Sequence, residues 1–222
     1  MARTTHQFSQ TKTAEIPRST FDLSHGYKTT FDSGLLVPIL SLEVLPADTI
    51  NCRAAIFARM ATLIKPVMDN LYCETFFFFT PARQTWTNWP KFMGEQDAPG
   101  DSTDYVVPQV DLAEVEEGDI FDYYGIPPGN YAPELQVNAM PFRAYNSIFN
   151  FWFRDENLVQ PVPVNLGDGP DPSSDYALKR RRKRRDYITS GLPWAQKGDP
   201  VTVDLGGQAP IVGIAFDKAE SW

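Results

Sequence analysis

Residues Met140–Leu158 read MPFRAYNSIFNFWFRDENL, and we interpret the rest of the chain by reference to this segment. At about 100° per residue its large apolar side chains fall on one broad arc and its polar side chains on the other, which predicts one amphipathic helix over 140–158. Pro141 fits this helix because it lies in the first turn, where its missing N–H has no helical partner. The apolar arc holds Phe142, Tyr145, Ile148, Phe149, Trp152 and Phe153, and the polar side holds Arg143, Asn146, Ser147, Asn150 and Arg154.

Phe151 lies off the apolar arc of this helix. Either a second surface covers its ring, which a neighbouring subunit would supply, or the ring stays exposed on an ordinary core helix. The pattern alone favours neither. We take Phe151, with Trp86 and Trp89, as hypothetical subunit-interface residues.

The composition indicates a mainly β fold with long loops and a few helices. The chain has 222 residues, of which 42% are hydrophobic, with 19 Pro, 15 Phe, 9 Tyr and 5 Trp. Such a composition supports a real core with many irregular connections. Cys52 and Cys73 lack metal-ligand spacing, so we expect buried free thiols in a reducing compartment.

Three apolar stretches before residue 81 predict strands. Leu35–Leu45 contains Pro38, which suits an edge or bulged strand, and Thr49–Ala61 has mixed periodicity that leans to strand. Leu71–Thr80 (LYCETFFFFT) carries four consecutive phenylalanines, which cannot alternate and need apolar cover on both faces. We expect a central strand there, with Phe76–Phe79 buried in a complete subunit.

The rest of the chain is predicted to be arm, loop and short helix. Residues 1–20 are polar and indicate a flexible N-terminal arm, and Gln84–Gly94 predicts a short helix kinked at Pro90. Residues 95–139 are rich in Pro, Gly and Asp and predict a long loop with a short turn at Asp119–Tyr124. Residues 159–175 predict a second loop, and a further strand is expected from Val201.

Catalytic and metal-binding motifs are missing from the sequence. There is no Gly-rich phosphate loop and no HExxH, and His6 and His25 are the two histidines. We expect no enzyme and no cofactor. Asp168, Asp171 and Asp175 could gather a cation, but the spacing is not that of an EF-hand loop and turn formation is favoured. No signal peptide or membrane-spanning run is evident, so no membrane association is expected.

One segment is intensely basic within an acidic chain. The net charge is −8, from 20 Lys and Arg against 28 Asp and Glu. Seven of the basic residues are consecutive. Without them the chain has 13 basic and 28 acidic residues, a net charge of −15. The run is Lys179, Arg180, Arg181, Arg182, Lys183, Arg184 and Arg185 (179–185).

This run has three interpretations from composition: a solvated patch, a nuclear-import signal, or a contact to nucleic-acid phosphate. The aromatic residues that follow it, Tyr187 and Trp194, favour nucleic acid, because single strands are held by cationic grooves and by rings on which bases stack. No motif for sequence-specific recognition accompanies them.

Six blocks of the sequence resemble those of a known protein family. The blocks are HGYKTTFDSGLLVPI (25–39), FARMATLIKPVMDNLYCETFFFFTPARQTWTNWPKFMGEQ (57–96), PGDSTDY (99–105), the helix stretch 140–158, GDGPD (167–171) and RRKRRDYITSGLPWAQKG (181–198). Together they resemble the major capsid protein of gokushovirus-type Microviridae, small tailless icosahedral phages with single-stranded DNA.

The resemblance implies a viral eight-stranded jelly-roll β-sandwich with long insertions and a structural, non-catalytic role. It implies homo-oligomeric pentamers that assemble into an icosahedral shell around the DNA genome, with other virion and scaffolding proteins as partners. Capsid proteins of this family are more than twice as long, so residues 21–222 correspond to the N-terminal part of the jelly-roll domain and leave the sandwich incomplete. An open sheet edge follows. The alternative function is a monomeric module that binds single-stranded nucleic acid through 179–185 without sequence preference.

Overall fold

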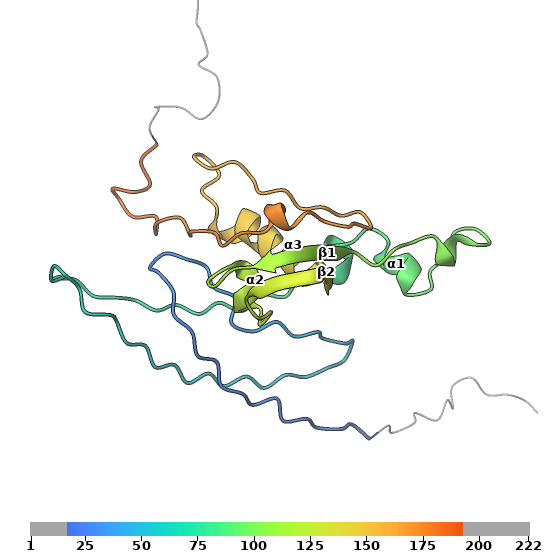
Figure 1. The fold of residues 1–222 in the computed structure, drawn as a ribbon, viewed down its shortest axis with the longest axis horizontal. Helices are drawn as coiled ribbons and strands as arrows, with labels where there is room; N and C mark the ends of the chain where they lie inside the picture. The colour runs from blue at the N-terminus through green and yellow to red at the C-terminus, as the bar shows by residue number, and fades with distance from the viewer. Residues whose placement is uncertain (1–16, 193–222) are drawn as a thin grey trace, which may run out of the picture.

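A two-stranded antiparallel sheet lies at the centre of the fold. The structure, a computed structural model, describes residues 17–192. Strand β1 (Gln109–Val115) pairs with β2 (Gly129–Asn138), with Gln109 opposite Asn138 and Val115 opposite Gly129. Helices α2 (Ile120–Tyr123) and α3 (Met140–Ile148) lie beside this pair and α1 (Trp89–Phe92) lies beyond one end of it, while the residues coloured blue to teal run as long extended segments away from the sheet (Figure 1).

Both strands lie within residues 95–139, so the prediction of a long loop there is wrong. Val110 and Leu112 alternate into the core of the sheet, but the register shifts between Leu112 and Glu114. An irregularity of this kind breaks the two-residue period that would reveal a strand in the sequence, and Pro133 in β2 obscures it further. The short turn predicted at Asp119–Tyr124 is confirmed as helix α2 (Ile120–Tyr123).

The predicted helix 140–158 forms, but it is shorter than expected. Helix α3 (Met140–Ile148) continues as a π-helix, η4 (Phe149–Phe153), in which the Arg154 N–H donates to the Phe149 carbonyl at 2.8 Å. The backbone becomes extended at Arg154, so residues 154–158 lie outside the helix. The wider π turn shifts the side chains after Ile148 away from the regular 100° spacing.

The apolar arc of α3 packs on the sheet. Phe142 and Tyr145 join the buried residues of β1, and Phe142 meets the ring of Phe121 from α2 at 5.0 Å between centroids. This side of the helix is as the sequence predicted. The core cluster is Val110, Leu112, Val115, Ile120, Phe121, Ala139, Phe142, Tyr145 and Tyr176.

The polar side of α3 is buried as well, which the amphipathic pattern did not indicate. Arg143 and Asn146 have no exposed surface. Asn146 donates to the carbonyls of Pro163 and Asp175 at 3.1 and 3.2 Å, and Asn150 exchanges two hydrogen bonds with the backbone of Val162 at 2.7 and 2.8 Å. Polar helix residues therefore hold the backbone of the irregular segment 159–176, which within the described residues pairs with the sheet only at a bridge between Asp171 and Val110 of β1.

Arg143 is the centre of this polar core. Its Nε and Nη2 donate to the two carboxylate oxygens of Asp171 at 2.7 and 2.8 Å, and its Nη1 donates to the carbonyls of Thr85 and Gly167 at 2.9 and 2.8 Å. Asp171 also accepts hydrogen bonds from Asn165 and from the Tyr176 hydroxyl, both at 2.6 Å. One buried bidentate ion pair thus ties α3 to two distant loops.

Asp171 gives the fold a dependence on pH. Burial alone would raise the pKa of Asp171, but hydrogen bonds from Arg143, Tyr176 and Asn165 and the charge of Arg143 together hold it below its ordinary value. A carboxyl with a lowered folded pKa contributes stability that is complete above its unfolded pKa, about 3.9. That stability is lost as the pH falls through the folded pKa.

We therefore expect the urea midpoint of unfolding to fall steeply once the pH drops below about 4, measured on a chain kept monomeric by Phe77→Ser and Phe79→Ser. The Asp171→Asn variant should be less stable at pH 7 and should lose part of this acid slope. Asp97→Asn, at an exposed position, serves as the control and should leave the slope unchanged. Equal slopes for wild type and Asp171→Asn would contradict the assignment.

Short helices complete the described elements. They are η2 (Ala82–Gln84), α1 (Trp89–Phe92), η3 (Asp101–Thr103) and η5 (Ser173–Asp175). The short helix predicted over Gln84–Gly94 is confirmed as α1, with Pro90 in its first turn rather than at a kink.

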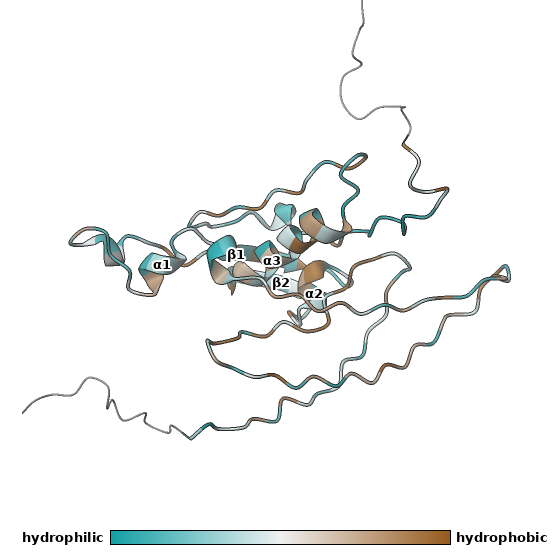
Figure 2. Cartoon of the chain, turned by 180° about the vertical axis from the view of Figure 1, so that it is seen from behind, coloured by the Kyte–Doolittle hydropathy of each residue, from teal (hydrophilic) through white to brown (hydrophobic). Residues whose placement is uncertain are grey.

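The three strands predicted before residue 81 do not form in the described chain. Leu35–Leu45, Thr49–Ala61 and Leu71–Thr80 are irregular, apart from a bridge between Leu35 and Arg180. They run as extended segments with many apolar stretches, shown brown in Figure 2. Cys52 and Cys73 on these segments are free but exposed, so their expected burial is wrong.

The run Phe76–Phe79 is exposed in this chain, with exposed fractions of 41, 68, 41 and 76% in order. The four side chains do alternate, contrary to expectation. Phe76 and Phe78 meet the ring of Phe153 at 5.2 and 5.7 Å, while Phe77 and Phe79 are the more exposed pair. Their burial in a complete subunit stays a prediction.

The described residues are mainly non-helical, with one small antiparallel sheet and few helices. No helix in 17–192 is long and apolar enough to cross a membrane. Most of the predicted N-terminal arm 1–20, and the strand predicted from Val201, lie outside the described residues.

Candidate functional site: the basic segment

The basic segment, Lys179–Arg185, lies against the extended residues 34–36 and the end of η4. Leu36 N–H donates to the Lys179 carbonyl at 2.9 Å, and Arg181 N–H donates to the Gly34 carbonyl at 3.0 Å, in an antiparallel pairing. Arg182 N–H donates to the Phe153 carbonyl at 3.0 Å. The first four residues of the segment are therefore fixed by their backbone.

Tyr145 of α3 links this pairing to the core. Its hydroxyl donates to the Leu36 carbonyl and accepts from the Lys179 N–H, both at 2.9 Å. Burial raises the pKa of Tyr145 to about 12, so its hydroxyl stays protonated across the neutral range. The apolar side of the predicted helix thus also positions the basic segment.

Within the described residues, three of the seven basic side chains have hydrogen-bond or ion-pair partners. Arg180 donates to the Ser33 carbonyl at 2.8 Å. Arg181 and Arg184 both form ion pairs with Glu74. Their guanidinium groups also lie over rings, Arg181 over Phe76 at 5.7 Å and Arg184 over Tyr72 at 5.3 Å.

The other cations are available to a ligand. Lys183 and Arg185 are exposed, and within the described residues neither they nor the side chain of Arg182 has a hydrogen-bond partner. Tyr187 is 99% exposed two residues after the segment. Trp194, the second predicted stacking residue, lies outside the described residues.

Asp186 ends the basic segment with a tight turn. Its carboxylate accepts hydrogen bonds from the backbone N–H groups of Thr189 and Ile188 at 2.6 and 2.8 Å. Hydrogen bonds from the backbone and hydroxyl of Thr189 hold the pKa of Asp186 below its ordinary value. The Asp186 carboxylate is therefore used by the turn that contains the exposed Tyr187.

The three hypothetical interface residues have different surroundings. Phe151 is 82% exposed, so its ring has no cover in the described chain. Trp89 is half-buried in a cluster with Trp86 and Phe92. The interface hypothesis for Trp86 is wrong. Its side chain is 1% exposed, and its indole N–H donates to Asp168 at 2.7 Å. The ring therefore fills the chain's own core and is not available to a neighbouring subunit.

The aspartates of the GDGPD stretch serve the fold. Asp168 accepts hydrogen bonds from Trp86, from the Asn88 side chain at 2.8 Å and from the Val106 N–H at 3.2 Å. Burial would raise the pKa of Asp168, but these hydrogen bonds and the charge of Lys91 lower it overall. Within residues 17–192 no group of three His, Cys, Asp or Glu is placed to hold a metal ion.

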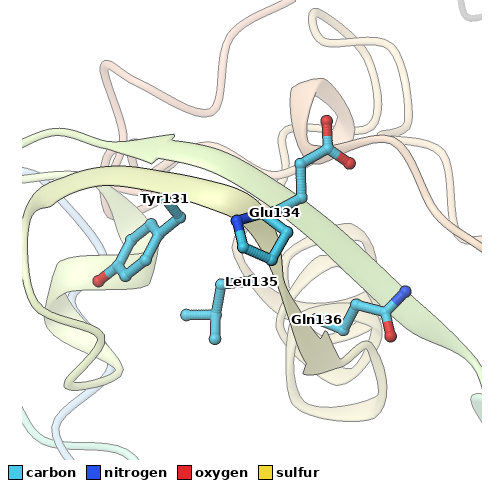
Figure 3. A pocket seen from close by; sticks show the side chains of 5 residues that line it. Tyr131, Glu134, Leu135 and Gln136 are labelled. Carbon is cyan, nitrogen blue, oxygen red and sulfur yellow. The ribbon is translucent and has the colours of Figure 1, made fainter.

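The open hollow beside β2 does not offer an active site. Tyr131 and Leu135 lie on one side of the strand, and Glu134 and Gln136 point to the other (Figure 3). The polar groups therefore do not converge on a common point, as catalysis or small-molecule binding would require.

Two residues of the basic site were missed in the sequence. Glu74 and Tyr72 lie more than 100 residues before the arginines that they contact. A charged residue inside the apolar stretch LYCETFFFFT was the available signal, because an acidic side chain there needs a partner.

Comparison with known proteins identifies the family. The sequence model of a family described as "Capsid protein (F protein)" matches residues 9–221. The chain belongs to this capsid protein family. The chain is 47% identical over 211 residues to capsid protein VP1 of Bdellovibrio phage phiMH2K, covering 94% of this chain and 39% of the relative.

Two other capsid proteins VP1 agree with this assignment. Identity is 41% over 241 residues to that of Chlamydia phage 1, covering 95% of this chain and 40% of the relative. It is 34% over 223 residues to that of Spiroplasma virus 4, covering 93% and 39%. The resemblance to gokushovirus-type capsid proteins is thus confirmed, as is the expectation that the chain is not an enzyme. The chain spans about two fifths of the length of these relatives.

Proposed function

We propose that this chain is part of a capsid subunit that assembles through pentamers into a T=1 icosahedral shell around a circular single-stranded DNA genome. In this proposal the longer protein completes an eight-stranded jelly roll, and other virion and scaffolding proteins are its partners. The subunit resides in the virion and assembles in the bacterial cytoplasm.

The basic segment is the observation that carries the proposal. A shell around a genome holds many phosphates close to protein, and the rest of this chain has a net charge of −15. Lys179–Arg185 offers cations beside the exposed ring of Tyr187, which suits single-stranded nucleic acid without sequence preference. We therefore place this segment on the inner face of the shell.

The exposed apolar segments support assembly rather than a monomeric nucleic-acid-binding module. Phe57, Ile64 and Met68 are each more than 90% exposed, and the backbone around them is unpaired. Apolar surface of this extent is the mark of an interaction site. Burial between subunits, or beneath the remainder of the subunit, would cover it.

The genome contact is tested with cations whose side chains have no hydrogen-bond or ion-pair partner within the described residues. The triple variant Arg182→Gln, Lys183→Gln, Arg185→Gln removes three of them and leaves the backbone pairing intact. The matched control removes three exposed cations elsewhere, Lys28, Lys65 and Arg83. Binding of a labelled oligothymidine is measured by fluorescence anisotropy across a salt series.

We expect the triple variant to flatten the salt slope of single-strand binding by about 2, from about 0.7 per lost contact. The control should leave the slope nearly unchanged. Phage shells carrying the triple variant should assemble but contain less DNA.

The competing role of the basic segment is a contact to an acidic strip of a neighbouring subunit, such as Asp111–Asp119. In that case the triple variant would fail to form shells while its affinity for oligothymidine stayed at the wild-type value. That combination would reject the genome contact.

A further inference from the structure

Glu74 occupies the centre of the basic site. One carboxylate oxygen pairs with Arg181 and the other with Arg184. In the part of the chain that the structure describes, both ion pairs of the basic segment are made to this one residue. Its side chain is 28% exposed, so the carboxylate is open to exchange with solvent.

The neighbours of Glu74 complete a site of mixed character. Tyr72, Glu74 and Phe76 are at alternate positions of an extended segment, which places their side chains on one side. The two arginines that pair with Glu74 also lie over the flanking rings, at 5.3 Å for Tyr72 and 5.7 Å for Phe76. Tyr72 remains 72% exposed.

Two arginines around one anion, with rings on both sides, is the chemistry of a nucleotide site. Guanidinium groups bind phosphate oxygens in the same paired geometry that they use for a carboxylate. An exposed ring beside the phosphate can stack on a base, and every base offers a face for stacking. The Glu74 carboxylate lies where a phosphate of single-stranded nucleic acid would bind.

We propose that Glu74 is an internal competitor for phosphate, displaced when single-stranded nucleic acid binds Arg181 and Arg184 and stacks a base on Tyr72. This inference rests on the proposed genome contact of the basic segment. The inference adds a specific site to that contact. It also adds a competing interaction, because in the absence of nucleic acid Glu74 neutralises two of the seven cations. Ion pairs between partly exposed groups are weak in water, so a polyanion that releases counterions can replace one carboxylate.

The experiment compares Glu74→Gln with Asp69→Asn. Asp69 is exposed on the same extended segment, and its carboxylate accepts a hydrogen bond from the neighbouring Asn70 N–H at 2.7 Å. Both variants remove one negative charge, but only the first releases arginines. Affinity for labelled oligothymidine and its salt dependence are measured for wild type and both variants.

We expect Glu74→Gln to bind about tenfold more tightly at 0.1 M salt, because nucleic acid no longer has to displace a carboxylate from Arg181 and Arg184. Asp69→Asn should change the affinity by less than about twofold, since it acts only through the net charge. Adding Arg181→Gln and Arg184→Gln to Glu74→Gln should abolish the gain and flatten the salt slope by about 1.4, the value for two lost phosphate contacts. Tyr72→Leu combined with Glu74→Gln should lower the affinity and leave the salt slope unchanged, because a stacked base neutralises no phosphate.

Equal affinity for Glu74→Gln and Asp69→Asn would overturn the inference while leaving the genome contact in place. Absence of salt-dependent binding in the wild type and in every variant would overturn the genome contact as well. If the Glu74→Gln variant does not fold, the Glu74→Asp variant is used in its place. Its shorter side chain keeps the charge but cannot reach both arginines. An affinity unchanged in Glu74→Asp would then reject the competition.

Discussion

Replacing Arg143 by methionine is expected to lower the free energy of unfolding by about 3–5 kcal/mol, the usual cost of breaking a buried ion pair on one side. Arg143 is fully buried, and the substitution leaves the Asp171 carboxylate charged inside the protein. It also leaves the carbonyls of Thr85 and Gly167 without their donor. Urea unfolding followed by near-ultraviolet circular dichroism measures the loss, with Phe77→Ser and Phe79→Ser present in every variant to keep the chain monomeric.

Two further variants show whether the loss comes from the buried pair. Arg83→Met changes the same residue type at an exposed position and should cost less than about 0.5 kcal/mol. The double variant Arg143→Met, Asp171→Asn should be less destabilised than the sum of the two single variants, because no uncompensated charge stays buried. A loss of less than about 1 kcal/mol for Arg143→Met would contradict the role assigned to the pair.

Helix α3 shows which structural features hydrophobic periodicity predicts and which it does not. The existence of the helix, its start beside Pro141 and its core face through Phe142 and Tyr145 follow from the spacing of apolar residues. The burial of Arg143 and Asn146 does not, because the periodicity of a helix indicates which face is apolar and not what covers the polar face. Their partners lie in a loop whose path no local pattern specifies.

The strands were predicted in the wrong places. Residues 35–80 have the composition of strands, but a strand needs a partner, and within the described residues these segments have almost none. β1 and β2 do pair, yet a register shift and Pro133 hide their period. Composition therefore predicted extended backbone correctly and pairing incorrectly.

The basic segment was evident from the sequence, but its surroundings were not. Seven adjacent cations are visible in any composition scan, whereas the contact from Arg181 to Glu74 joins residues 107 positions apart. The pairing with residues 34–36 is equally remote. Long-range contacts of this kind depend on the complete fold, so only the three-dimensional structure separates the engaged arginines from the free cations.

The outer face of the phenylalanine run should control self-association of this chain. Phe77 and Phe79 are 68 and 76% exposed, on a backbone without strand partners. Such a segment promotes edge-to-edge association, so we expect the wild-type chain to aggregate. The pair Phe77→Ser, Phe79→Ser should shift it largely to monomer, measured by analytical ultracentrifugation. A monodisperse, cooperatively melting wild-type monomer would contradict this expectation.

The inner pair provides a control of identical composition. Phe76 and Phe78 pack on Phe153 of η4 and are each 41% exposed, so Phe76→Ser, Phe78→Ser loosens this packing and leaves the outer rings in place. Aggregation should persist in that variant. In the longer capsid protein we expect the outer-pair variant to block shell formation, because each buried phenylalanine contributes about 1.5–3 kcal/mol. If both pairs abolished aggregation equally, loss of hydrophobicity in general, and not the outer face, would be the cause.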